Sequence, residues 1–308
     1  MNYRSIFIAT IQTVGLFLCG LFIPILAWMI TPVPLILAYV RNSRSDSLTA
    51  LGLSTIITTF IAGWHMAIFL LLIFGLMAVT EAESLRRKLK PEISILAGAL
   101  PSVVVIGFVM AYYFIHTGKN PFAVVETYIQ GERAEALKLY GNLGFKEVVD
   151  AISSIPDASI HYFVLLLPCI LTLAFVSIAA CSYAISRSII IRKPGSGPIL
   201  APAVFGSWHA PDTWVWGLIA ALAIFLVPAE TAKIAGWNLV IPFATLYLIQ
   251  GVALMDYFLK AKMHLHPVVR ILIHSIILSL PSILFVIVIG IVDIWADFRK
   301  LRGPVQKA

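Results

Sequence analysis

Thirty-five consecutive residues, Ile6 through Val40, contain no Asp, Glu, Lys or Arg. Six further stretches share this property: Leu48–Thr80, Ile93–Ile115, Tyr162–Ile185, Thr213–Ala229, Trp237–Met255 and Ile271–Val292. A helix rises about 1.5 Å per residue, so about 20 apolar residues cross a hydrocarbon core about 30 Å thick. With 60% hydrophobic and only 12% charged residues, the chain has more apolar surface than a water-soluble fold can hide. We therefore expect an all-α, polytopic transmembrane helical bundle that forms a single domain over residues 1–308.

Basic residues between the apolar stretches predict the topology. They form four clusters: Arg41/Arg44, Arg86/Arg87/Lys88/Lys90, Arg187/Arg192/Lys193 and Lys260/Lys262/Arg270. Lys and Arg are retained on the cytoplasmic side, so an even number of crossings should separate each cluster from the next. Leu48–Thr80 must then be a two-helix hairpin that turns near Gly63–His65. This pattern of basic residues is typical of membrane loops, so we expect no nucleic-acid partner.

The first and last apolar stretches leave alternatives open. As one helix, Ile6–Val40 would extend about 50 Å, which is too long for one untilted crossing. Prolines at 24, 32 and 34 predict either two short helices or one crossing with a re-entrant piece. At the other end, one crossing would place a basic tail outside, against the charge rule, and Pro281 could instead kink or break this segment. We expect 8–9 crossings.

The segment Thr117–Ile160 is the main polar region, with four Lys/Arg against six Asp/Glu. Its apolar residues recur at helical spacing, and Gly141 and Gly144 divide it into two short amphipathic helices. The acidic balance predicts an extracytoplasmic helical hairpin over 117–160.

The chain lacks the patterns of common catalytic and metal sites. GxxxxGK[ST], HExxH and GxSxG are absent from the sequence. The apolar stretches carry no acidic or basic residue, which argues against a pump driven by intramembrane carboxylates. We expect no catalytic residue, no metal and no cofactor, and we do not favour an enzyme.

Three polar-aromatic groups stand out in the last third of the chain. The first contains Trp208, Pro211, Asp212 and Trp214, the second Asn238, Gln250 and Gly251, and the third Gly290, Asp293, Trp295, Asp297 and Arg299. Tryptophans commonly anchor helices at the membrane interface, and Asp212 could cap the helix that follows. Amides inside spans often bond neighbouring helices. Asp293 and Asp297 are four residues apart on one helix face, with Arg299 available as a partner.

The order and spacing of these three groups resemble the YybS-like family of bacterial membrane proteins, a domain of unknown function. The resemblance implies a multi-pass protein of the bacterial inner (cytoplasmic) membrane with no established activity. The general architecture is also similar to substrate-binding subunits of energy-coupling-factor transporters and to rod-shape proteins of the MreD kind.

Two functions remain open from the sequence. The first is a small-solute binding or transport subunit that lacks its own energising domain. Its expected substrate-binding residues are Asn238, Gln250, Asp293, Trp295, Asp297 and Arg299, with structural or interfacial roles for Trp208, Pro211, Asp212, Trp214, Gly251 and Gly290. The alternative is a membrane scaffold that acts through protein contacts in envelope processes. The expected partners are the lipid bilayer and an energising or envelope-synthesis protein.

Overall fold

Every regular element in the described part of the chain is a helix. The computed structural model describes residues 2–192, 205–277 and 282–300. A helix bonds its backbone groups internally, as hydrocarbon requires, so the expected helical membrane bundle is confirmed. The chain divides into two compact units, Met1–Leu200 and Ala201–Ala308, hereafter the N-terminal and C-terminal units. A single domain over the whole chain stays a prediction.

The N-terminal unit begins with a pair of short helical limbs. The first is α1 (Tyr3–Cys19); the second consists of α2 (Pro24–Ile30) and α3 (Val33–Arg41). Pro24 lies in the first turn of α2, where its missing N–H costs no helical hydrogen bond. The start of α1 lies beside the end of α3: Asn42 Nδ2 donates to Ser5 Oγ, and the Asn2 N–H donates to Asp46 Oδ2 at 3.3 Å. The chain thus returns to its starting end, which resolves Ile6–Val40 into two short limbs.

A second hairpin follows, and it turns where the charge pattern predicts. Helix α4 (Arg44–Ala62) ends at Gly63, and the next helix runs through α5 (Trp64–Phe69), the π-helical η1 (Leu70–Gly75) and α6 (Leu76–Arg86). Gly63 has φ +87° and ψ 163°, a conformation that is open essentially to glycine alone. The returning helix buries Phe74 against Phe17 of α1, with ring centroids 5.9 Å apart.

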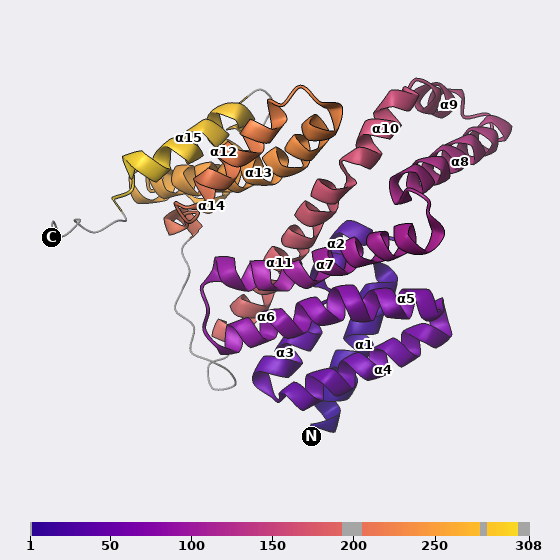
Figure 1. Cartoon of the computed structure of the whole chain (residues 1–308). Helices are drawn as coiled ribbons and strands as arrows, with labels where there is room; N and C mark the ends of the chain where they lie inside the picture. Colours follow the sequence, from indigo (N-terminus) through magenta and orange to yellow (C-terminus); the bar gives the residue numbers. More distant parts are fainter. Residues whose placement is uncertain (1, 193–204, 278–281, 301–308) are drawn as a thin grey trace. The chain divides into compact units, whose positions relative to one another are not determined.

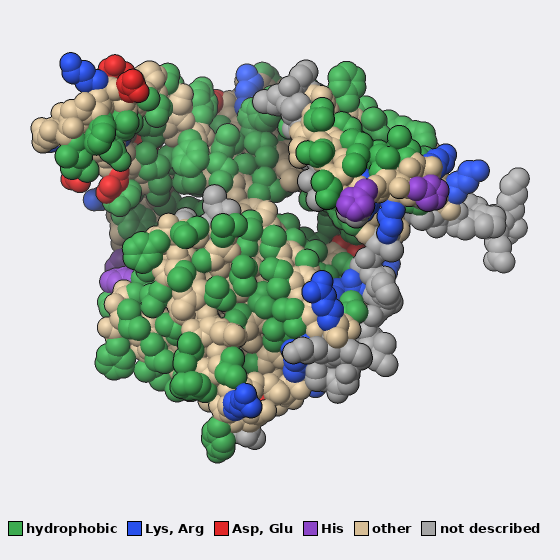
Figure 2. All heavy atoms as spheres, turned by 180° about the vertical axis from the view of Figure 1, so that it is seen from behind, with side chains coloured by type: hydrophobic (Ala, Val, Ile, Leu, Met, Phe, Trp, Pro, Cys, Tyr) green, Lys and Arg blue, Asp and Glu red, His purple; other side chains and the backbone are tan. Residues whose placement is uncertain are grey.

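An exposed helical hairpin connects two long apolar helices. Its parts are α8 (Pro121–Asn142), α9 (Lys146–Ser153) and α10 (Asp157–Leu165), placed between α7 (Pro91–Thr117) and α11 (Leu167–Arg192). No residue of α8 or α9 is buried, and the hairpin projects from the bundle (Figure 1). The Arg133–Asp157 ion pair at 2.7 Å and the hydrogen bond between His161 Nδ1 and Glu126 Oε2 at 2.9 Å hold α8 beside α10. Charged side chains gather on the hairpin, whereas the bundle surface is mostly apolar (Figure 2). The segment is helical, as expected, but α8 is 22 residues long and a third helix, α10, begins at Asp157. Its amphipathic character and its extracytoplasmic side stay predictions.

The C-terminal unit packs shorter helices against one long helix. The elements are η2 (Phe205–Ser207), α12 (Trp214–Phe225), α13 (Glu230–Ala261), α14 (Pro267–Ile277) and α15 (Ile283–Ala296). A Cβ on Gly251 would lie 2.1 Å from the Val286 carbonyl oxygen, and one on Gly290 would lie 2.1 Å from the Tyr247 oxygen. Only glycine permits this approach of α13 and α15, as in other membrane helix pairs.

The described residues of the last apolar stretch lie in α14 and α15. Pro281, at which a kink or break is predicted, lies outside the described residues, as do Lys193, Arg302 and Lys307. Within the described residues, five helical segments are long and apolar enough to cross a membrane: Arg44–Ala62, Trp64–Arg86, Pro91–Thr117, Leu167–Arg192 and Glu230–Lys260. The other apolar helices are shorter, and the count of 8–9 crossings stays a prediction.

Gly63→Ala should lower the free energy of unfolding by about 1–3 kcal/mol, because alanine is strained in the conformation that glycine adopts there. Gly52→Ala is the matched control: a Cβ at this α4 position meets nothing within 4 Å, so its better helix propensity should stabilise the protein by about 0.5–1 kcal/mol. Thermal unfolding in detergent measures both. Equal stability of the two variants would contradict the turn.

Candidate functional site

The Asp293–Arg299 pair closes the end of α15. Asp293 Oδ2 lies 2.6 Å from Arg299 Nη2, and their side chains are 4% and 1% exposed. Arg299 Nη1 also donates to the carbonyl oxygens of Gly206 at 2.7 Å and Trp208 at 2.8 Å. The pairing expected from sequence is confirmed. The guanidinium ties the helix end to a segment more than 90 residues earlier.

Gln250 belongs to the same packed region of the C-terminal unit. Its side chain is buried, and its Oε1 accepts from the Ala210 N–H at 3.0 Å. This bond joins α13 to the segment before α12. Gln250 directly precedes Gly251, at which α13 closely approaches α15. The Trp208, Gln250 and Asp293 groups named in the sequence therefore converge on one region.

The residues before α12 form the entry to that helix. The helix begins at Trp214, and the Thr213 side chain before it makes no capping hydrogen bond. The backbone oxygens of Pro211 and Asp212 accept from the N–H groups of Trp214 and Val215. The capping role of the Asp212 side chain stays a prediction.

Three of the expected binding residues lie apart from this region or face outward. Asn238 is twelve residues from Gln250, about 18 Å along α13, and its Nδ2 donates to the Ile234 oxygen at 3.0 Å. Trp295 is 67% exposed. Asp297 ends α15 with φ +40°. The polar groups that do converge bond mainly to one another, so a substrate role for the six residues stays a prediction.

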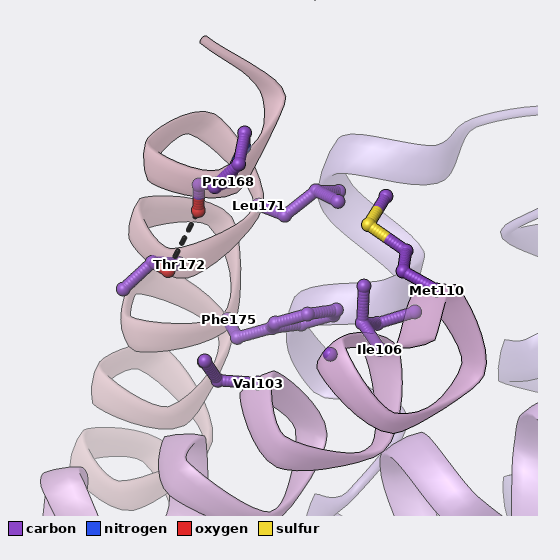
Figure 3. Close-up of a pocket in the computed structure, with 8 residues that line it drawn as sticks. Val103, Ile106, Met110, Pro168, Leu171, Thr172 and Phe175 are labelled. Carbon is purple, nitrogen blue, oxygen red and sulfur yellow. Dashed lines mark hydrogen bonds between the residues drawn. The ribbon is translucent and has the colours of Figure 1, made fainter. Parts of the chain in front are cut away.

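A hollow of about 200 Å³ lies between α7 and α11 in the N-terminal unit (Figure 3). Its lining consists of Val103, Ile106, Gly107, Met110, Pro168, Leu171, Thr172 and Phe175. The Thr172 hydroxyl donates to the Pro168 carbonyl oxygen at 2.7 Å, so the polar atom in the wall is already bonded. Such a hollow, hereafter the α7–α11 groove, accommodates an apolar ligand and offers no charge. Its residues look like any lipid-facing residues in the sequence, which is why the pattern gave no signal.

Glu81 is a second feature that sequence reasoning missed. The stretch without Asp, Glu, Lys or Arg ends at Thr80, yet the helix continues to Arg86 and Glu81 has no exposed surface. Ser182 Oγ lies 2.6 Å from its Oε2 and joins α6 to α11. The available signal was periodicity, since Met77, Ala78 and Leu85 place position 81 on the apolar face of the helix. The apolar stretches themselves contain no carboxylate, as expected, but the helix carries a buried one just beyond Thr80.

Comparison with known families rests on nearly the whole chain. Residues 11–294 match the family described as "Predicted membrane protein (DUF2232)". The chain belongs to this family. No curated protein and no solved structure matches it. Among the described residues of this DUF2232 protein, no three His, Cys, Asp or Glu side chains are grouped to hold a metal ion.

Asp293→Ala in the DUF2232 protein should lower the free energy of unfolding by about 3–5 kcal/mol, because it leaves the buried Arg299 charge without its partner. Trp295→Ala, two residues away on an exposed surface, should change it by less than about 0.5 kcal/mol. Melting temperatures in detergent compare the two. A fully stable Asp293→Ala variant would show that the pair does not hold the helix end.

Proposed function

We propose that this protein is a small-molecule binding or transport subunit of the bacterial cytoplasmic membrane, with the α7–α11 groove as its binding site. The observation that carries the proposal is the open space at Gly107, where an added Cβ would meet nothing within 4 Å. Gaps between packed helices are normally filled by side chains, whereas this one remains open along an apolar wall.

The lining determines the class of ligand. An apolar ligand would be stabilised by removing the surface of Met110, Phe175 and the aliphatic residues from water. A charged group of the ligand would find no partner there. The ligand should therefore be apolar in the part that enters the groove, such as a ring system or a hydrocarbon chain. A polar end would extend toward the α8–α10 hairpin, which is joined to both walls of the groove through the ends of α7 and α11.

Energy for transport would come from a partner protein. The sequence contains no phosphate-binding loop of the GxxxxGK[ST] type, so nucleotide hydrolysis would require a second subunit. This is the arrangement of energy-coupling-factor transporters, whose substrate-binding subunits are similar to this chain in general architecture only.

Gly107→Leu should abolish ligand binding in the groove, because the added side chain occupies the hollow. The ligand is first found by screening apolar vitamins and metabolites. At a concentration of 100 times its Kd it should stabilise the wild type by about 2.7 kcal/mol, measured as a rise in melting temperature. The rise should vanish in Gly107→Leu and persist in Gly15→Leu, whose glycine is also an exposed helical residue with open space around its Cβ. An undiminished rise in Gly107→Leu would contradict the proposed site.

A scaffold role in envelope processes remains the second candidate, and the hairpin favours it. Tyr128, Leu139 and Leu143 are 66%, 57% and 59% exposed, which is unusual for apolar residues on a largely polar helix pair. Crosslinks from the hairpin to one envelope protein, together with no ligand-induced rise in melting temperature, would favour the scaffold over the binding subunit.

A further inference from the structure

Glu81 is a fully buried carboxyl group at the contact of three helices. It lies on α6, and its neighbours include Gly98 of α7 and Ala179 of α11. A Cβ on Gly98 would lie 3.2 Å from Glu81 Cγ and 3.3 Å from Cδ. The glycine therefore leaves room for the carboxyl group inside the bundle.

The two hydrogen-bond distances at Ser182 indicate the protonation state of the Glu81 carboxyl. Ser182 Oγ lies 2.6 Å from Glu81 Oε2 and 3.1 Å from the Ala179 carbonyl oxygen. A serine hydroxyl has one hydrogen, which the two oxygens would have to share if Glu81 were a carboxylate. Both contacts are hydrogen bonds when Glu81 donates its own proton to Ser182 and Ser182 donates to Ala179. A protonated Glu81 completes the network, and a carboxylate does not.

The electrostatic surroundings of Glu81 also favour the protonated carboxyl. Within the described residues, no Lys, Arg or His forms an ion pair with Glu81, and its Oε1 has no hydrogen-bond partner. A buried carboxylate without a cation costs several kcal/mol, and the neutral acid avoids that cost.

Ionisable groups on the helices packed against α6 are engaged elsewhere or lie toward its basic end. On α3, Tyr39 donates to Glu83 Oε2 at 2.7 Å and Arg41 donates to the Ile189 oxygen at 2.8 Å. Glu92 on α7 and Tyr183 and Arg187 on α11 lie toward that end, and Tyr183 interacts electrostatically with Glu81, Glu92 and Arg187. Cys181 directly precedes Ser182 on α11. Polar groups thus extend from Glu81 toward the Arg187 end of α11.

Ser186 adds a step in that direction. It follows Ser182 by four residues, so both lie on one face of α11, and it is also fully buried. In the described structure its hydroxyl has no hydrogen-bond partner. The Ser186 hydroxyl is therefore available to accept one hydrogen bond and to donate another between Glu81 and the basic end of the helix.

We propose that Glu81 is a proton-binding site of the membrane bundle, which holds a proton in the packed structure and exchanges it, past Ser186, with solvent water at the Arg187 end of α11. This inference goes beyond the proposed function and stands whether or not the α7–α11 groove binds a ligand. The ligand of this site is the proton itself.

Infrared spectroscopy of the full chain in lipid nanodiscs at neutral pH tests the site directly. The C=O stretch of a protonated carboxyl lies above the amide I band, and the bands of a carboxylate lie below it. The wild-type minus Glu81→Gln difference spectrum should contain the protonated band, and the band should move to lower wavenumber within minutes of transfer to D₂O. Glu83→Gln is the matched control, since Glu83 is bonded to Tyr39 and to Arg87; this variant should keep the band.

A second variant covers failure of Glu81→Gln to fold. Ser182→Ala keeps the carboxyl and removes its hydrogen-bond partner, so the protonated band should remain and shift to higher wavenumber. Absence of the band in wild type overturns the proposal, because Glu81 would then be a carboxylate. A band that resists exchange in D₂O also overturns it, because the proton would be a fixed structural one. Neither outcome bears on the Gly107→Leu test, so the two proposals fail separately.

Discussion

The hydrocarbon core of a membrane cannot form hydrogen bonds with backbone N–H and C=O groups, and this constraint explains why the described chain is helical. The chain satisfies it with helices, and several hydroxyl side chains bond back onto the helix that carries them. Thr10 donates to the Ile6 oxygen at 2.8 Å, Thr31 to the Ala27 oxygen at 2.9 Å and Ser84 to the Thr80 oxygen at 2.8 Å. These hydroxyls find their partners on the local backbone, whereas the buried Ser186 hydroxyl has none in the described structure.

A few buried hydrogen bonds between distant segments hold the helix ends in place. Arg41 reaches the Ile189 oxygen and joins α3 to α11 in the N-terminal unit. In the C-terminal unit, Arg299 joins the end of α15 to Gly206 and Trp208. In both cases an arginine caps backbone oxygens near a helix end, where the intrahelical bonds run out. The polar-aromatic residues of the last third thus gain a structural explanation from their own contacts.

Sequence reasoning predicted those features that depend on local chemistry or on charge. The turn at Gly63 followed from the basic clusters, and the return within Ile6–Val40 was one of two alternatives allowed by its prolines. The Asp293–Arg299 pair followed from short spacing. The carbonyl partners of Arg299 could not be predicted, because they lie more than 90 residues away in the chain. Glu81 was missed because Glu83 and Arg86 beside it resemble a polar loop, and only the packing of α7 and α11 shows that one carboxyl is enclosed.

The expected crossing of α7 would orient all the others. Its 27 residues extend about 40 Å between the basic turn at Lys88 and the α8–α9 hairpin. Cysteine labelling measures it directly, after replacement of the native Cys19, Cys169 and Cys181 by serine. Single cysteines at Lys88 and Glu132, both exposed, are then treated in intact cells with a maleimide that cannot cross membranes. A transmembrane α7 with a cytoplasmic basic turn predicts labelling of Glu132→Cys in intact cells and of Lys88→Cys only after permeabilisation. Labelling of both in intact cells would contradict it.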